Sequence, residues 1–332
     1  MNNHAGANRR RFLTLAAASC FGLASAGLSM SSLAAEIDSI HFLIPGGAGG
    51  GWDGTARGTG EALTKAGLIK TASYQNLSGG GGGKAIAHII ETASQQKGTL
   101  MVNSTPIVVR SLTRVFPQSF RDLTPVAGTI ADYGAFVVRN DSPIKSWKEV
   151  VAGFKADPRK MKFAGGSAKG SLDHLVPAAA IKAEGLDPKA LKYIPYDAGG
   201  KAMAGLLSGE AQLLSTGLGE ALEMSKAGQV RILAITAPER LADAPDVPTL
   251  VEMGNPTVFA NWRGFFGAPG LSKAEADAYA EVLGKMYKTP EWETVRARNG
   301  WVNVYKPGSE FYAFLEEQEK QVGDLMRELG FL

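Results

Sequence analysis

The sequence predicts an α/β fold of two lobes, each with a mostly parallel sheet flanked by helices. Short apolar stretches alternate with helical patterns, and such alternation produces parallel sheets covered on both faces. Glycine-rich runs stand where the strands lead into helices. The alternation occurs twice in a chain of 332 residues, which is longer than most single domains.

The first set of elements has a glycine-rich run after its first strand and another after its second. We expect a helix to follow the run 45–51, with Asp53 as its N-cap and its end near Ala66. The strand candidates of this set are 40–44, 72–75 and 100–102. A second helix is expected after the run 79–83, because apolar residues recur there at helical spacing. These residues are Ala85, Ile86, Ile89, Ile90 and Ala93.

The second set repeats this pattern with four strand candidates. They are 161–164, 193–196, 212–215 and 230–236. The first three lead into the glycine-containing segments 165–171, 197–200 and 216–219. The helices that follow are expected from Ser171 to about Glu184, up to Gly209, and up to about Gly228.

The two sets are joined by apolar stretches that predict a hinge of two crossing strands. Two strand candidates, 126–130 and 134–138, lie between the sets. We expect the chain to cross between lobes near 131–137 and again near 236–240. After the second crossing the tail is helical, beginning with a capping box at Ser272 and ending with a long amphipathic helix.

This organisation makes the second lobe an insertion in the first. The first lobe is expected to comprise 35–134 and 238–332, and the second 135–237. The alternative is a single domain built on one doubly wound sheet, which a chain of this length permits.

Residues 1–34 have the three-part layout of an export signal that is removed. Arg9-Arg10-Arg11 precedes an apolar core of about 16 residues, which is too short for a membrane-spanning helix, and Ala34 ends the segment. The arginines with Phe12-Leu13 resemble the twin-arginine export motif, and an ordinary Sec signal is the alternative. Lipid anchoring at Cys20 is disfavoured, because Ala17 stands where a larger apolar residue is expected. We therefore expect a periplasmic protein without cysteine.

Removal of this segment leaves equal numbers of basic and acidic residues. A neutral body of this kind argues against a nucleic-acid partner, which would require clustered basic charge. No metal-binding spacing of His or Cys is present. We expect neither a metal nor a cofactor.

The glycine-rich runs predict a site for an anion. Ligands of open α/β sheets bind where strands lead into helices. Glycine lets backbone N–H groups face the ligand, and helix N-termini favour negative charge. The expected ligand is an anion with oxygen acceptors, either a phosphate or a carboxylate. The spellings of the P-loop and of the dinucleotide-binding motif both fail, which argues against a nucleotide.

Several side chains beside these runs have both a structural and a functional interpretation. Trp52 is either a core residue or a cleft wall, and Ser104 and Thr105 either donate hydroxyls or cap a short helix. Ser167 and Ser171 have the same ambiguity. An exported hydrolase that uses one of these serines with His174 is an alternative, although the nucleophile-elbow spelling fails at Lys169.

Five segments resemble the substrate-binding proteins of tripartite tricarboxylate transporters, which belong with the Bug extracytoplasmic receptors. The resemblance spans about 38–330 and rests on the segments 44–53, 140–146, 165–174, 237–250 and 260–264. It implies a periplasmic-binding-protein-like (type II) fold whose two lobes close on a carboxylate. The run 79–83 departs from the mixed Pro/Gly/Ala segment that is usual in the family, so its glycines are left out of the candidate site.

The resemblance implies the ligand-binding residues Ala48, Gly49, Gly50, Trp52, Ser104, Thr105, Ser167, Ala168, Ser171, Thr216 and Gly217. It also implies a non-enzymatic, monomeric receptor that delivers a citrate-like di- or tricarboxylate to membrane permease subunits. An aromatic carboxylate such as phthalate or terephthalate is the alternative ligand, and a sensor accessory protein is the alternative role.

Overall fold

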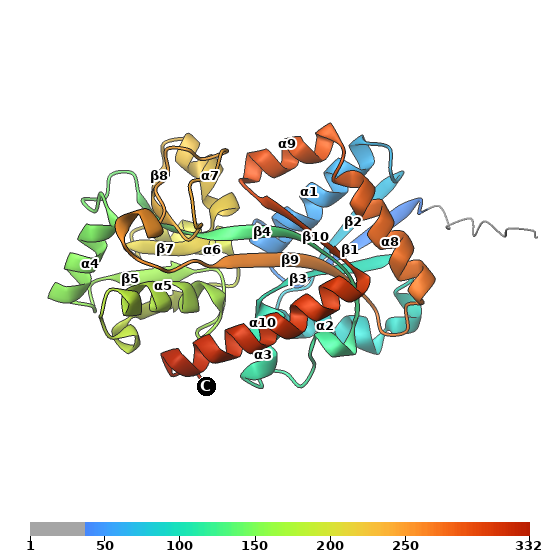
Figure 1. Cartoon of the computed structure of the whole chain (residues 1–332), viewed down its shortest axis with the longest axis horizontal. Helices are drawn as coiled ribbons and strands as arrows, with labels where there is room; N and C mark the ends of the chain where they lie inside the picture. The colour runs from blue at the N-terminus through green and yellow to red at the C-terminus, as the bar shows by residue number, and fades with distance from the viewer. Residues whose placement is uncertain (1–36) are drawn as a thin grey trace, which may run out of the picture. The chain divides into compact units, whose positions relative to one another are not determined.

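The structure is a computed structural model, and it describes residues 37–332. The expectations for the export signal, its cleavage and Cys20 therefore lie outside the described residues. Within the described range, ten strands form one mixed sheet with helices on both sides (Figure 1). The strands are β1 (Ser39–Ile44), β2 (Thr71–Asn76), β3 (Thr99–Ser104), β4 (Thr124–Arg139), β5 (Lys162–Gly165), β6 (Lys192–Pro195), β7 (Leu213–Gly217), β8 (Val230–Ile235), β9 (Ala260–Gly267) and β10 (Val302–Pro307). The α-helices are α1 (Gly51–Lys65), α2 (Gly83–Glu91), α3 (Pro106–Leu112), α4 (Trp147–Ala156), α5 (Leu172–Ala183), α6 (Gly199–Leu207), α7 (Leu218–Lys226), α8 (Lys273–Met286), α9 (Pro290–Asn299) and α10 (Gly308–Leu329).

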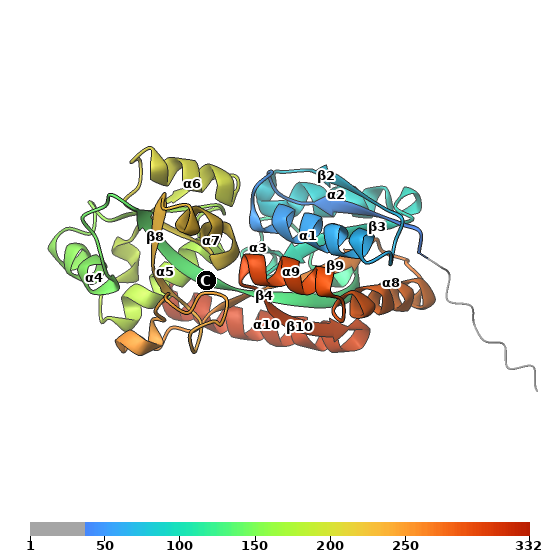
Figure 2. The ribbon, with the colours of Figure 1, turned by 90° about the horizontal axis from the view of Figure 1, so that it is seen from above.

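The sheet consists of two groups of strands that share β4. On one side the order is β2-β1-β3-β9-β4, with β10 also paired to β4. On the other side the order is β4-β7-β5-β6, with β8 also paired to β4. We call these groups sheet A and sheet B. Figure 2 shows β4 extending from one group to the other.

Each group has a parallel part, as expected, but the strands around β4 are antiparallel. β1 pairs in parallel with β2 and β3, and β5 pairs in parallel with β6 and β7. β4 is antiparallel to β7, β8, β9 and β10. The sheet is therefore mixed rather than mostly parallel, because the strands that connect the two groups run in opposite directions.

The prediction of two separate strands at 126–130 and 134–138 is wrong. These residues form the single 16-residue strand β4. The intervening residues Ala131, Asp132 and Tyr133 include no glycine or proline to make a turn, and they pair with Trp262, Asn261 and Ala260 of β9. One continuous strand therefore belongs to both sheets.

The helix after the first glycine-rich run begins at Gly51, and Asp53 is not its N-cap. Gly50 is the N-cap and has no side chain to cap with. Asp53 lies in the first turn, where its Oδ2 accepts a hydrogen bond from the Gly49 N–H at 3.0 Å. The Asp53 carboxylate therefore accepts a hydrogen bond from a backbone N–H at the positive end of the helix, as an N-cap would, although Asp53 itself lies in the first turn.

The expected capping box at Ser272 is confirmed. The Ser272 hydroxyl accepts from the Glu275 N–H at 3.2 Å, and the Glu275 carboxylate accepts from the Ser272 N–H at 3.2 Å. The short helix expected behind Thr105 is α3. The sequence prediction missed four elements: α4, α9, β9 and β10. Both missed strands pair with β4, which lies far away in the sequence, so no local pattern marks the pairing.

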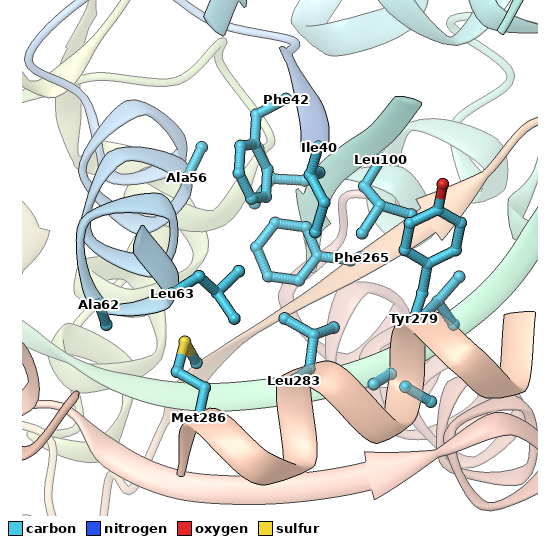
Figure 3. Packing of buried hydrophobic residues seen from close by; sticks show 14 of the residues in the cluster. Ile40, Phe42, Ala56, Ala62, Leu63, Leu100, Phe265, Tyr279, Leu283 and Met286 are labelled. Carbon is cyan, nitrogen blue, oxygen red and sulfur yellow. The ribbon is translucent and has the colours of Figure 1, made fainter. Parts of the chain in front are cut away.

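Sheet A packs against α1 and α8 around a core of large apolar side chains. Figure 3 shows Phe42, Phe265 and Leu283 meeting in this core, and each has no measurable exposure to solvent. Burial of each such side chain contributes about 1.5–3 kcal/mol. This core holds β1 and β3 firmly, and the loops at their carboxyl ends are thereby positioned.

The last helix, α10, contacts both groups of elements. Its Phe311 packs against Phe266 of β9. Leu315 and Met326 belong to the same buried cluster as Leu175 of α5. Lys182 of α5 also forms an ion pair with Glu328 at 2.7 Å. The C-terminal helix therefore extends along both sheets.

Candidate functional site

A cavity lies where loops from both sheets meet. Sheet A contributes the loop before α1 and the end of β3, sheet B contributes the loops before α5, α6 and α7, and β9 contributes two side chains. Its lining residues are Gly46, Gly47, Gly50, Gly51, Trp52, Ser104, Pro106, Gly166, Ser167, Leu172, Asp173, Asp197, Ala198, Gly199, Gly217, Glu220, Asn261 and Arg263. Strand ends and helix N-termini surround this cavity, as expected for a ligand site in an α/β fold.

The loops of the two sheets touch at the mouth of the cavity. The Ser78 hydroxyl, after β2, donates a hydrogen bond to Asp197 Oδ1, after β6, at 2.6 Å. A Cβ built on Gly47 would lie 3.2 Å from the Ala198 Cβ, and one on Gly50 would lie 3.3 Å from it. Glycine therefore permits the close approach of the two loops, and the cleft is closed in this structure.

The floor of the cavity contains an ion pair between the two strands that run between the sheets. Arg263 Nη2 of β9 lies 2.9 Å from Asp132 Oδ2 of β4, and their side chains are 4% and 1% exposed. Arg263 Nη1 also donates to Thr55 of α1 at 3.0 Å. Burial raises the pKa of Asp132 to about 6, although the Arg263 charge acts in the opposite direction.

Two glycines make room for this pair. A Cβ on Gly51 would lie 2.2 Å from Arg263 Nη2, and one on Gly217 would lie 2.1 Å from Asp132 Oδ2. Asp132 also accepts a hydrogen bond from the Gly219 N–H at the start of α7, at 3.3 Å. Gly51 and Gly217 thus have a steric role beneath the cavity.

One side of the cavity is acidic. Asp173 lies in the first turn of α5 and Glu220 in the first turn of α7. Burial raises the pKa of Asp173 to about 7, with the nearby Glu220 carboxylate as the second cause, while a hydrogen bond from Ser167 acts in the opposite direction. The Thr216 hydroxyl donates to Glu220. This acidic side is unexpected for a site that receives an anion.

Trp52 forms part of the opposite wall. Its Nε1 donates a hydrogen bond to the Ser104 hydroxyl at 2.8 Å, which joins the start of α1 to the end of β3. A Cβ on Gly46 would lie 2.9 Å from the indole ring, so the chain packs directly on its face. The ring both packs against the sheet A core and lines the cavity.

The structure brings five of the sequence-predicted site residues to this cavity: Gly50, Trp52, Ser104, Ser167 and Gly217. Gly49 lines a neighbouring cavity that shares Glu220 and Arg263 with the first. Ala168 lines another beside Ser78. The backbone oxygen of Ala48 faces Gly200 across the loop contact, 3.5 Å from where a Cβ would stand.

Three predicted residues are buried behind the cavity lining. Thr105 and Ser171 are 0% and 1% exposed, and their hydroxyl oxygens have no hydrogen-bond partner. Ser171 is the N-cap of α5 but makes no side-chain capping bond. Thr216 is 3% exposed and reaches the cavity only through Glu220.

The sequence reasoning missed the charged residues of the site. Asp132, Asp173, Asp197, Glu220 and Arg263 are each far from the others in sequence. The available signals were their positions: Asp173, Asp197 and Glu220 follow or lie near glycine-containing loops, and Arg263 stands in a segment that carries the family resemblance. Nothing in the sequence pairs Asp132 with Arg263.

The run 79–83 lies beside the main cavity rather than in it. Gly79, Gly80, Gly81 and Gly82 all have positive φ, which L side chains rarely adopt, and they lead directly into α2. Gly79, Gly81 and Gly82 line the same neighbouring cavity as Ser78 and Ala168. Backbone conformation therefore accounts for the first four glycines of this run.

The proposed serine–histidine pair of a hydrolase is not formed. His174 Nδ1 accepts a hydrogen bond from the Gly170 N–H at 3.0 Å, and its ring stacks on Tyr193 at 4.7 Å between centroids. Burial lowers the pKa of His174 to about 4, so this imidazole is neutral. The Ser171 hydroxyl has no partner, and the Ser167 hydroxyl accepts from the Asp173 N–H at 3.2 Å.

A comparison with known protein families shows to which family the chain belongs. The sequence profile described as "Tripartite tricarboxylate transporter family receptor" matches residues 56–331. The chain belongs to this receptor family.

Relatives of the tricarboxylate receptor family extend over most of the chain. Protein BugT of Bordetella pertussis is 29% identical over 296 residues, covering 88% of this chain and 89% of BugT. An uncharacterised-family protein from the tcbD-tcbE intergenic region of Pseudomonas sp. strain P51 is 25% identical, covering 86% of this chain and 84% of the relative. The resemblance inferred from the sequence segments is confirmed. The family is one of solute-binding receptors, and the chain is not an enzyme.

Solved structures confirm the periplasmic-binding-protein-like fold. The periplasmic binding protein BugD superposes with a TM-score of 0.79 at 21% identity, covering 88% of this chain and 97% of BugD. MatC of Rhodopseudomonas palustris, solved with bound malate, has a TM-score of 0.76 at 20% identity, covering 86% of this chain and 98% of MatC. An R. palustris protein solved with adipate has a TM-score of 0.78 at 20% identity, covering 88% of this chain and 97% of that protein.

Within residues 37–332, none of the helices has the length and apolar character needed to cross a membrane. The same part of the chain contains no cluster of three or more His, Cys, Asp or Glu side chains suited to a metal ion.

Proposed function

We propose that this receptor is periplasmic, captures a small di- or tricarboxylate between two lobes, and delivers it to the membrane subunits of a tripartite tricarboxylate transporter. The observation that carries the proposal is the cavity itself, because loops from sheets A and B line it together. A solute held there contacts both groups of elements at once. Such contact favours the closed arrangement and so couples binding to closure.

The cavity offers features suited to a carboxylate. Helix α1 begins at Gly51 and helix α6 begins at Gly199, and both glycines line the cavity. Helix N-termini carry unpaired N–H donors and a partial positive charge. Arg263 Nε is buried without a hydrogen-bond partner and belongs to a lining residue. Together these groups supply donors for carboxylate oxygens.

The division into lobes that we propose follows the sheets, with the hinge in β4 and β9. The first boundary stays at about 134, inside β4. The second moves from about 237 to about 259, because Leu250 packs in the sheet B core with Phe163 and the Phe259 N–H bonds to Thr236 at 3.0 Å. The segment 238–259 thus belongs with the second lobe. Within this division α10 contacts both lobes.

A thermal-shift screen of the purified protein tests the proposal. The solutes are citrate, tricarballylate, succinate, malate, phthalate and terephthalate, with inorganic phosphate as the control. A solute at 100 times its dissociation constant stabilises the folded protein by about 2.7 kcal/mol, which raises Tm by several degrees. Shifts with aliphatic carboxylates and none with phosphate support the proposal. Shifts with phthalates alone select the aromatic alternative, for which the Trp52 wall would be the cause.

The delivery step requires a separate experiment. The receptor loaded with its solute should support uptake into vesicles that contain the permease subunits, and the empty receptor should not. Binding of the loaded receptor to a sensor protein without uptake would instead support the role of a sensor accessory.

A further inference from the structure

The acidic side of the cavity contains carboxylates without cationic partners. Asp197 forms an ion pair with Lys201 at 3.4 Å, and Asp132 pairs with Arg263. Among the ion pairs within residues 37–332, none includes Asp173 or Glu220. These two side chains line the same cavity and are close enough for the Glu220 charge to act on Asp173.

Asn261 adds a further acceptor to this cavity. Its Oδ1 is buried and has no hydrogen-bond partner. Buried acceptors without a donor are costly, by about 1–3 kcal/mol each. The cavity therefore has an unsatisfied acceptor in Asn261, two carboxylates without an ion-pair partner in Asp173 and Glu220, and an unsatisfied donor in Arg263 Nε.

A dicarboxylate without a nitrogen can accept hydrogen bonds from the donors of the cavity, but it has no donor group to offer Asn261, Asp173 or Glu220. One of its carboxylates can receive hydrogen bonds from Arg263 Nε and from helix N-termini. Its second carboxylate would meet Asp173 or Glu220 in a partly desolvated space, where like charges repel strongly. A ligand with both a carboxylate and a donor group satisfies both the donors and the acceptors.

We propose that the ligand carries a protonated nitrogen in addition to its carboxylate, and that Glu220 and Asp173 bind this ammonium group. The inference rests on the proposed receptor function and narrows its substrate class to amino-carboxylates. Thr216 positions Glu220 by donating to it, and the Ser167 hydroxyl accepts from the Asp173 N–H at the start of α5. Both carboxylates stand at helix N-termini, which stabilise their negative charge when the site is empty.

The competing arrangement is a protonated Asp173 that donates to the second carboxylate of a plain dicarboxylate. The pKa of about 7 for Asp173, raised mainly by burial, allows this arrangement at or below neutral pH. The two arrangements differ in the ligand that they prefer and in the pH at which they prefer it.

Isothermal titration calorimetry with solutes that share a carbon skeleton distinguishes the ammonium site from the protonated Asp173. The pairs are L-aspartate with succinate, and L-glutamate with glutarate, measured at about pH 8, where Asp173 is ionised. We expect the amino-carboxylate of at least one pair to bind at least about tenfold more tightly than its partner, the size of one charge-assisted hydrogen bond. Equal or tighter binding of succinate and glutarate would overturn the ammonium site and leave the receptor function standing. Absence of binding by every carboxylate tested, in folded and ligand-free protein, would overturn the receptor function itself.

Two variants test whether Glu220 and Asp173 cause the preference for an amino-carboxylate. E220Q and D173N keep side-chain volume and remove a negative charge, so each should weaken binding of the preferred amino-carboxylate about tenfold and strengthen binding of its plain partner. The matched control is E223Q, because Glu223 is exposed on the same helix and does not line this cavity. Circular dichroism and Tm verify that each variant folds. An unchanged preference in both E220Q and D173N would remove these residues from the proposal.

Discussion

Arg263 and Asp132 form an ion pair that connects the two strands extending between sheet A and sheet B. The pair joins β9 to β4 at 2.9 Å and is almost fully excluded from solvent. Each partner also reaches a helix next to the cavity: Arg263 bonds Thr55 of α1, and Asp132 accepts from Gly219 of α7. One buried contact thereby ties together the helices that line both sides of the cleft.

Removal of one member of this pair should destabilise the fold strongly. R263A leaves the Asp132 carboxylate buried without its partner, which costs about 3–5 kcal/mol in similar cases. Urea denaturation measures the free energy of unfolding of the variant. The double variant R263A/D132N should lose less than R263A and D132N together, because neither charge remains unpaired. R327A is the control, since Arg327 and Asp324 are both exposed and such pairs contribute little; equal effects of R263A and R327A would contradict the prediction.

The Ser78–Asp197 hydrogen bond should help to hold the cleft closed. It joins residues 119 positions apart, from loops of different sheets. S78A removes the donor and should weaken ligand binding by about two- to tenfold, the effect of one hydrogen bond. Small-angle scattering should show a larger radius of gyration for S78A without solute. S208A is a suitable control, because the Ser208 hydroxyl bonds only to Gly205 within the same turn; the idea fails if S78A and S208A bind alike.

Trp52 and Ser104 should be coupled in ligand binding. W52F keeps an aromatic ring and removes the Nε1 donor, and S104A removes the acceptor. A double-mutant cycle on the dissociation constants should give a coupling of about 0.5–1.5 kcal/mol, because both single changes break the same bond. Strictly additive losses would show that the hydrogen bond has no part in shaping the cavity wall. W147F provides a comparison at a buried tryptophan that bonds to Glu184 away from the cavity.

Ionisation of Asp173 should lower the stability of the fold as the pH rises, whereas the buried His174, with a pKa of about 4, contributes in the opposite direction. The pKa of Asp173 in the folded protein, about 7, exceeds the unfolded value near 3.9, so the folded state binds the proton more tightly. The stabilising effect is complete below about pH 4 and is lost as the pH rises through about 7. Asp132, with a pKa raised to about 6, contributes in the same direction.

D173N removes this titration and should flatten the dependence of the unfolding free energy on pH over that range. D246N should leave the dependence as in the unaltered protein, because Asp246 is exposed. Urea denaturation at several pH values provides the comparison. A slope that is identical in all three proteins would show that Asp173 ionises in the folded state as it does in the unfolded chain.

Much of the fold could be predicted because its strong signals are local. The alternation of apolar strands, glycine-rich loops and helices located the parallel strands β1, β2, β3, β5, β6 and β7, and the Ser272 capping box located α8. The strands β9 and β10 escaped because their pairing partner β4 lies about 130 and 170 positions away, and pairing over that separation leaves no local pattern. The helix start at Gly51 rather than at Asp53 escaped because glycine at the N-cap has no side chain to mark it.

The sequence by itself determined the glycine-rich loops at strand ends and the resemblance to the tricarboxylate receptors, and it predicted an anion as the ligand. Those conclusions depend on patterns of residues that lie close together in the sequence, and such patterns can be recognised without the tertiary structure. Only the tertiary structure brought Asp132 to Arg263, placed Asp173 and Glu220 on one wall, and joined Ser78 to Asp197. The physical reason is that a charge acts on whatever lies within a few ångströms of it, and the chain folding decides which residues those are.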